Sequence, residues 1–174
     1  MIDEPTYTPG SKDNVRMYET EVCRTKRYQP CCAHGIYIGD EHSQKGSVVL
    51  LGIGGTTIVH DDSATTNGKV LFVAVADSVF CLSVPELNTF WIQKVDFVAC
   101  MGVFWIDSLS SIITWGELDV CRYTESGEKI WCTSGPEPLT SAFEVLPNHI
   151  KVKDFENDVY TIDYESGAMV KINK

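Results

Sequence analysis

LDVCRYTESGEKIWC, residues 118–132, has a counterpart forty residues away on each side. The upstream counterpart is SVFCLSVPELNTFWI at 78–92, and the downstream one is DVYTIDYESGAMVKI at 158–172. The three copies align without a gap, and self-similarity at a fixed period of this size is the signature of a repeat protein. The sequence therefore predicts a fold built from successive units of forty residues.

Two sets of aligned positions indicate how the units pack. One set marks a turn and the other lies on the strand that follows it: Leu87, Gly127 and Gly167, and Trp91, Trp131 and Lys171. Glycine suits a turn with positive φ because it has no Cβ to clash. The two tryptophans should pack between neighbouring sheets, where each buries a large apolar area. Lys171 should face water, because the last unit has no following unit against it.

Each unit divides into four short strands of β-forming residues. In the middle unit they are expected at about 97–106, 110–115, 118–124 and 128–133, with turn residues between them. Hardly any segment has helical periodicity. A four-stranded antiparallel unit of about forty residues has the size of a propeller blade. We therefore predict an all-β, β-propeller-like array of three to four four-stranded antiparallel sheets.

The whole chain, 1–174, is expected to form a single domain. Its units are predicted at about 57–96, 97–136 and 137–174, preceded by a degenerate unit at about 17–56. The degenerate unit contains three strand-like segments in the order of a regular unit, at 17–23, 34–40 and 47–53. Four units, which we favour, could close a small ring, whereas three units plus an edge could leave an open, propeller-like stack. The sequence leaves both arrangements open.

The charge of the chain limits its partners. Its 24 acidic and 14 basic residues give a net charge of −10. An acidic surface releases no counterions from nucleic acid and is repelled by anionic membranes, so we expect neither partner. The first residues, MIDEPTYTPGSKDN, lack the features of a signal peptide, and the longest apolar run, at 70–76, is too short to span a bilayer. A cytoplasmic protein is predicted.

The seven cysteines also favour a cytoplasmic protein. Four of them lie in apolar strand-like runs, which predicts mostly buried, reduced thiols: Cys81, Cys100, Cys121 and Cys132. Cys23, Cys31 and Cys32 could ligate a metal, but their Cys-x7-Cys-Cys spacing matches no established zinc motif. No metal or cofactor is predicted.

The period also suggests a central ring of side chains. In a propeller the first strand of each blade lines the axis, and we place these strands at 57–63, 97–103 and 137–143. Equivalent positions at one level would then be His60, Cys100 and Thr140, with Asp62 two residues beyond His60 on the same strand face. Such a ring could hold a metal, or its histidine and cysteine could pair as base and nucleophile, which makes it a speculative binding site. It could equally be ordinary core, in which a buried histidine only satisfies its hydrogen bonds.

Other polar residues carry weaker signals. Glu117 and Asp119 alternate along one strand face and Arg122 lies on the other, which the solvation of an edge strand explains without catalysis. Three further histidines lie beside turn signals and are expected to be exposed: His34, His42 and His149. No residue is predicted to be catalytic.

Parts of the chain resemble known families. The pattern Tyr160-x-x-Asp163-x-x-x-Gly167 resembles the repeats of quinoprotein- and WD-type propellers, in which a tryptophan follows, as Trp131 does in the preceding unit. The segments 52–64, 82–103 and 115–123 are similar to a group of uncharacterised bacterial proteins of similar length. The resemblance implies a propeller-like fold and a bacterial source, and it carries no activity or cofactor.

Two functions from different classes remain. The preferred one is a non-enzymatic protein-interaction module whose acidity suits a basic partner, for example an immunity-type protein that neutralises a basic toxin. The alternative is a small metal- or ligand-binding enzyme that uses His60, Asp62 and Cys100. Side chains of catalytic type are sparse, which favours the first function. The sequence leaves the oligomeric state open.

Overall fold

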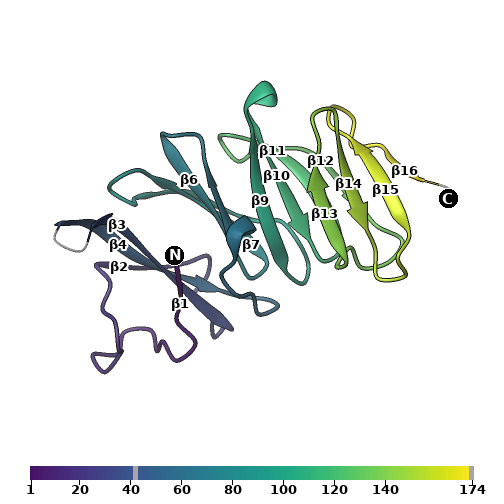
Figure 1. The fold of residues 1–174 in the computed structure, drawn as a ribbon. Coiled ribbons are helices and arrows are strands. Elements are labelled where there is room, and N and C mark those ends of the chain that lie inside the picture. Colours follow the sequence, from purple (N-terminus) through teal and green to yellow (C-terminus); the bar gives the residue numbers. More distant parts are fainter. Residues whose placement is uncertain (41–42, 173–174) are drawn as a thin grey trace.

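The computed structural model describes residues 1–40 and 43–172, which form four four-stranded sheets. We name them sheets A to D in chain order. Figure 1 shows the sheets side by side, with the N-terminal sheet A at one end and the C-terminal sheet D at the other. The all-β, propeller-like prediction is confirmed, and the sheets form an open stack rather than a closed ring.

Sheets B, C and D are regular antiparallel units whose strands follow one another in chain order. Sheet B contains β5 (Ala64–Thr66), β6 (Val70–Val75), β7 (Ser78–Ser83) and β8 (Thr89–Lys94). Sheet C contains β9 (Cys100–Ile106), β10 (Ser111–Gly116), β11 (Asp119–Thr124) and β12 (Lys129–Ser134). Sheet D contains β13 (Ala142–Val145), β14 (His149–Lys153), β15 (Val159–Asp163) and β16 (Met169–Lys171). The last strands begin at 89, 129 and 169, which preserves the period of forty.

Sheet A departs from this order. Its strands are β1 (Ile2–Asp3), β2 (Thr20–Cys23), β3 (Cys32–Asp40) and β4 (Ser43–Gly52), arranged as β1-β3-β4-β2. The predicted strand at 17–23 exists as β2, but it pairs in parallel with β4 and is not the first strand of a regular unit. Ile2–Asp3 occupies the opposite edge. The long β3–β4 hairpin would otherwise expose two edges, and the N-terminal segment covers both.

The predicted first strands of the other units begin later than expected. Residues 57–60 are irregular and are followed by the 3₁₀ turn η1 (Asp61–Ser63), so the strand assignment at 57–63 is wrong. His60 caps this turn: its N–H donates to Ser63 Oγ at 2.9 Å, and its Nδ1 accepts from the Asp62 N–H at 3.3 Å. Short polar side chains compete with strand pairing through such local hydrogen bonds.

Helical structure in the described residues consists of η1 and a second 3₁₀ turn, η2 (Asp107–Leu109). Neither turn approaches the length or apolarity that a bilayer-spanning helix requires, and no other helix occurs in residues 1–40 and 43–172.

Burial explains why strand patterns differ along the chain. Sheet B is covered on both faces: Phe72 and Ala74 of β6 face sheet C, whereas Val73 and Val75 face sheet A. A strand buried on both faces is apolar at every position. Sheet D is covered by sheet C on one face only, so β14 alternates between buried and exposed residues.

The tryptophans join neighbouring sheets, as expected. Trp91 of β8 donates from Nε1 to the Glu125 carbonyl at 3.0 Å, and its indole lies over Gly127 in the next sheet. Trp131 of β12 repeats the contact with the Tyr164 carbonyl, at 2.8 Å, and with Gly167. Sheets B and C therefore each close over the last turn of the sheet that follows.

The predicted state of the cysteines is wrong for one pair. Cys121 on β11 and Cys132 on β12 lie directly opposite each other and are joined by a disulfide. The two strands belong to one hairpin of sheet C, so the bond links neighbours within a sheet. Cys81 and Cys100 are free and buried, as expected.

Candidate functional site

The four residues of the predicted ring lie in different environments. His60 and Asp62 are exposed on the η1 turn, and Thr140 is exposed in the segment before β13. Cys100 is buried at the start of β9, where its thiol donates to the Gly102 carbonyl at 3.4 Å. Complete burial raises the pKa of this thiol, which keeps it protonated. Asp62 packs near Gly102, because a Cβ on that glycine would lie 3.3 Å from the Asp62 Cβ.

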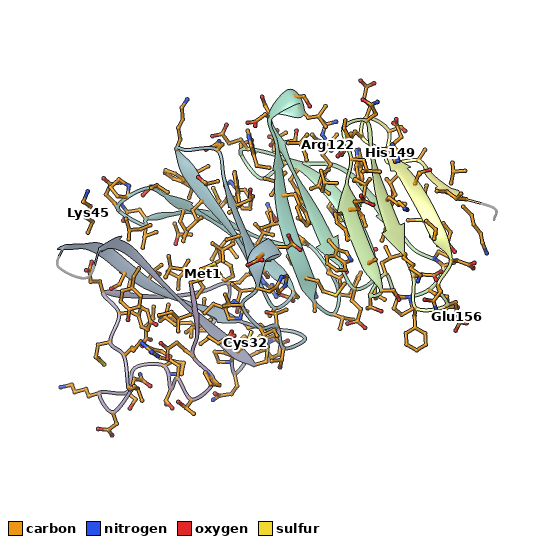
Figure 2. The ribbon with its side chains drawn as sticks, in the orientation of Figure 1. Met1, Cys32, Lys45, Arg122, His149 and Glu156 are labelled. Carbon is orange, nitrogen blue, oxygen red and sulfur yellow. A yellow bond between two sulfur atoms is a disulfide. The ribbon has the colours of Figure 1, made fainter. Side chains whose placement is uncertain are left out.

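The residues that were expected on an edge strand have structural contacts. β11 is an interior strand of sheet C, so solvation of an edge cannot explain Asp119 and Arg122. Asp119 accepts a hydrogen bond from Ser134 Oγ at 2.6 Å, and Glu117 lies in the turn between β10 and β11. The guanidinium of Arg122 donates to the Tyr164 carbonyl at 3.0 Å, which ties sheet C to sheet D. Figure 2 shows Arg122 beside the upper rim of these two sheets.

A groove lies between sheets B and C. Its volume is about 790 Å³. Its walls come from β6, β7 and β8 of sheet B and from the β9–β10 and β11–β12 turns of sheet C: Lys69, Val70, Cys81, Phe90, Trp91, Ser110, Thr124, Glu125 and Ser126. We call these residues the B/C groove. Phe90 is 61 % exposed, although an aromatic side chain of this size is normally covered. Glu125 adds a carboxylate to a groove that is otherwise lined largely by apolar side chains such as Val70, Phe90 and Trp91.

His34, which the structure buries completely, was not singled out from the sequence. His34 is completely buried on β3, whereas His149 is half-buried and His42 lies outside the described residues. The turn signals around "AHG" predicted exposure, but this segment is the start of a central strand with β1 on one side and β4 on the other. A histidine two residues after a cysteine on a strand was the only signal available, since such residues share one face.

The imidazole of His34 is held by three elements. Its Nε2 lies 3.1 Å from the Thr57 carbonyl oxygen and 3.4 Å from Oδ1 of Asp3 on β1. The Asp3 carboxylate is fixed in turn, because both of its oxygens accept the Val59 N–H at 3.0 Å. The other ring nitrogen, Nδ1, is buried without a hydrogen-bond partner of regular geometry.

Cys32 lies on the same face of β3, and Cys31 precedes it. The Cys32 thiol is 3.8 Å from Thr57 Oγ1 and 4.0 Å from the Cys31 sulfur. A Cβ on Gly52, which pairs with Cys32 across the hairpin, would lie 2.7 Å from the Cys32 sulfur. Glycine at this position therefore makes the space that the thiol occupies. Figure 2 shows Cys32 at the lower end of sheet A, next to the segment that leads into sheet B.

The electrostatics of this cluster shift the pKa values of both Cys32 and His34. Burial opposes ionisation of Cys32, but its interactions with His34 and with Thr57 lower the pKa of the thiol below the ordinary value. Burial likewise opposes protonation of His34, but the contacts with Cys32, the Thr57 carbonyl and Asp3 raise the pKa of the imidazole. Cys31 behaves differently: burial and the neighbouring Cys32 raise its pKa to about 11. The two adjacent thiols therefore differ: the pKa of Cys32 is lowered, whereas that of Cys31 is raised.

Metal binding finds no support in the described part of the chain. Across residues 1–40 and 43–172, no three side chains of His, Cys, Asp or Glu are grouped in a way that could hold a metal ion. Structural and catalytic zinc sites need three or four protein ligands.

Comparison with protein-family models finds no match, and comparison with curated protein sequences finds none either. Comparison with solved structures does find similar folds. The Pan2 WD40 domain of Neurospora crassa superposes with a TM-score of 0.54 at 15% identity, covering 65% of this chain and 38% of that one.

Two further structures agree with this result. The WD40 repeats of RRP9 give a TM-score of 0.53 at 11% identity, over 64% of this chain and 38% of that one. BamB from Moraxella catarrhalis gives 0.55 at 8% identity, over 76% and 43%. The chain therefore spans about two-fifths of the length of each of these structures. At these identities the likeness concerns the fold alone, and it shows a β-propeller-like arrangement of the sheets.

Proposed function

We propose that this chain is a non-enzymatic protein-interaction module that binds an extended, basic segment of a partner protein in the B/C groove. The observation that carries the proposal is the groove itself, which the exposed Phe90 lines together with Val70 and Trp91. Aromatic side chains in a concave surface are typical anchors of protein–protein interfaces.

Charge supports a basic partner. The chain has a net charge of −10, and Glu125 in the groove is followed by the exposed Glu128 in the same turn. An acidic surface attracts a basic segment over distances of about 8–10 Å at moderate salt, which speeds association. Lys69 is the one basic residue among those that line the groove.

The fold supports a scaffold role. Stacked sheets that close over one another through Trp91 and Trp131 form a rigid support, and contact surfaces of such repeat proteins lie on their grooves and loops. WD40 domains are among the structures to which the chain is similar. A bacterial immunity-type protein that neutralises a basic toxin is one example of the proposed class.

Selection from a random peptide library displayed on phage tests the proposal. We expect the peptides selected on the immobilised wild-type protein to be basic and to contain a large apolar side chain. Their association rate should fall several-fold between about 50 and 150 mM NaCl, because salt screens the attraction between opposite charges. Phe90→Ser should abolish their binding.

Val170→Ser provides the matched control. Val170 is as exposed as Phe90, at 61 %, but lies on the last strand of sheet D, far from the groove. Binding should survive this substitution. Neutral or acidic consensus peptides, or equal losses in both variants, would contradict the proposal.

A further inference from the structure

Among the described residues that line the B/C groove, Glu125 is the only one with a carboxylate. We propose that Glu125 determines which segment the groove accepts, by binding one lysine or arginine side chain of the partner next to the apolar side chain that packs on Phe90. Asn67 and Trp91 position this carboxylate. The inference rests on the proposed function, and it differs from a general attraction between opposite charges because one position, rather than the net charge, decides the choice.

The apolar contact comes from a bulge in β8. Phe90 and Trp91 both line the groove, although successive residues of a regular strand face opposite sides of a sheet. The register of β8 on β7 shifts at this point: Trp91 and Thr89 pair with successive residues of β7, which leaves Phe90 between them without a partner. A bulge of this kind re-aims a side chain. Two neighbouring aromatic side chains therefore line the same groove.

The backbone at Glu125 is fixed by sheet B and by its own turn. Trp91 donates from Nε1 to the Glu125 carbonyl at 3.0 Å. Within the turn, Thr124 Oγ1 accepts the Glu128 N–H at 3.0 Å, and the Thr124 carbonyl accepts the Gly127 N–H at 3.0 Å. The turn between β11 and β12 therefore holds Glu125 beside the Trp91 indole.

The side chain of Glu125 is held by the turn between β5 and β6. Asn67 Nδ2 donates to Glu125 Oε1 at 3.1 Å. The other end of this amide is also engaged, because Asn67 Oδ1 accepts the N–H groups of Lys69 and Val70, each at 3.0 Å. Rotation of the amide would break all three bonds, so the carboxylate is oriented before a partner binds. Such pre-organisation lowers the cost of association.

The second carboxylate oxygen, Oε2, is available to a partner. Within residues 1–40 and 43–172 it accepts no hydrogen bond, and Glu125 forms no ion pair. An ammonium or guanidinium group would donate to it in a charge-assisted bond, near the Trp91 indole, whose face also attracts cations. Because Asn67 already donates to Oε1, the site offers one contact rather than the bidentate pair that favours arginine. Lysine should therefore be accepted as well as arginine.

Glu128 is a matched reference in the same turn. It is exposed and carries the same charge as Glu125, but it does not line the groove, and no described residue donates a hydrogen bond to its carboxylate. Substitution of either residue changes the net charge by the same amount. If net charge alone attracted the partner, the two residues would be equivalent, whereas the structure holds only Glu125 in the groove.

Parallel selections from one random peptide library displayed on phage test the assignment on immobilised wild type, Glu125→Lys and Glu128→Lys. Wild-type peptides should carry Lys or Arg at a fixed distance from the apolar residue. On Glu125→Lys an acidic residue should take this position beside the same apolar residue, whereas Glu128→Lys should select the wild-type pattern. Equal changes in both variants, or a basic residue retained on Glu125→Lys, would overturn the assignment and leave the groove intact. Peptides without the apolar residue in all three selections would contradict the proposed function itself.

Asn67→Asp tests whether the orientation of the carboxylate matters. Aspartate keeps the oxygen that accepts the two backbone N–H groups, but it replaces the donor to Glu125 with an oxygen that repels it. Calorimetric titration with the wild-type consensus peptide should show an affinity at least about fivefold lower, although the variant is more acidic. Attraction by net charge alone predicts the opposite sign, so an unchanged or higher affinity would overturn the assignment.

Neutral substitutions give a second measurement that leaves the Asn67 turn intact. With the same peptide, Glu125→Gln should lower the affinity about tenfold, because the charge-assisted bond is lost. Glu128→Gln should lower it by less than about twofold, as expected for an exposed charge outside the groove. These two variants decide if Asn67→Asp proves unstable in thermal denaturation. Equal losses would show that Glu125 has no special role.

Discussion

The junction between sheets A and B is built differently from the two junctions that follow it. At the B/C and C/D junctions a tryptophan of one sheet covers a glycine turn of the next, with φ of +87° at Gly127 and +71° at Gly167. At the A/B junction the equivalent turn residue is Leu87, with φ of +58° and its side chain buried. Sheet A has no tryptophan to cover that turn, since the first in the chain is Trp91.

All three turns have a residue with positive φ at the same position. They differ in the side chain that packs over the turn, which is an indole in two cases and the leucine itself in the third. A left-handed backbone costs a non-glycine residue about 1–2 kcal/mol, whereas full burial of a leucine side chain contributes about 1.5–3 kcal/mol. Leucine is therefore tolerated where it fills the space itself. Glycine is required where an indole already lies there.

Polar contacts differ between the junctions in the same way. At the B/C junction the buried Asp96 carboxylate accepts four backbone N–H groups, from Val98, Ala99, Leu118 and Asp119. At the A/B junction the buried Asp77 instead pairs with Arg24 at 3.0 Å and Lys94 at 3.4 Å. The regular junction uses the backbone of the repeat, whereas the irregular one uses side chains: Arg24, which follows β2 of sheet A, and Lys94 of β8.

Removing the tryptophans should have the largest effect. Trp91→Ala and Trp131→Ala should each lower the free energy of unfolding by about 3–5 kcal/mol, because each leaves a cavity and an unpaired carbonyl. Urea denaturation followed by circular dichroism measures the loss. Lys171→Ala, at the same position in sheet D, against which no further sheet of residues 1–40 and 43–172 packs, should change stability by less than about 0.5 kcal/mol. Equal losses at all three positions would show that the tryptophans do not close the junctions.

Substitutions at the contacts of the two buried aspartates, Asp96 and Asp77, should have the next largest effects on stability. Asp96→Asn should cost about 2–4 kcal/mol, because an amide nitrogen replaces an oxygen that accepts two of the four backbone N–H groups. Arg24→Met should cost less, about 1–2 kcal/mol, because Lys94 still faces Asp77 and the Arg24 side chain is partly solvated. Chemical denaturation in low and high salt measures both. A larger loss for Arg24→Met would mean that the irregular junction is the stronger one.

Two glycines with nearly the same φ isolate the steric part of the comparison. Gly127 (φ +87°) would place a Cβ 2.9 Å from the Trp91 indole, whereas Gly68 (φ +85°) has open space around it. Gly68→Ala should cost about 1 kcal/mol, the backbone penalty alone, and Gly127→Ala about 1–3 kcal/mol more. Thermal denaturation of both variants, and of each combined with Trp91→Phe, measures the difference. Equal losses would contradict the packing of Trp91 over this turn.

The smallest effect concerns the last turn of sheet D. Asp163 accepts from the hydroxyl and N–H of Ser166 and from the Glu165 N–H, and these bonds lower the pKa of its carboxyl. A carboxyl with a lowered pKa in the folded state stabilises the protein above its ordinary pKa and loses that contribution as the pH falls through the folded value. Asp163→Ala should therefore be less stable than the wild type at neutral pH, and the difference should shrink at acid pH. Urea denaturation at about pH 7 and about pH 3 provides the comparison.

Much of sheets B to D could be predicted from the sequence because each unit is local. Strands that pair are neighbours in the chain, so a pattern within forty residues contains the information for a whole sheet. The equivalence of Trp91, Trp131 and Lys171 followed from the same period. Sheet A could not be predicted in this way, because β1 and β2 pair with strands far along the chain and one of them in parallel.

The Cys32–His34 cluster illustrates the same limit. Asp3, His34 and Thr57 come from three separate segments and meet because β1 pairs with β3 and the segment before η1 packs against both. No pattern within one unit could bring them together, and the alignment at period forty pointed instead to His60 and Cys100. Cys100 is isolated by burial in the core, whereas Nε2 of the buried His34 faces two acceptors, the Thr57 carbonyl and the Asp3 carboxylate.

By itself the sequence determined the all-β class, the period of forty, the turn positions and the residues that close the regular junctions. These depend on backbone conformation and on contacts between adjacent units, both of which leave a periodic mark. Only the tertiary structure decided the order of strands in sheet A, the open stack, the B/C groove and the Cys32–His34 cluster. Each of these depends on contacts between segments that are distant in the chain, where hydrogen bonding and burial act without any repeating pattern.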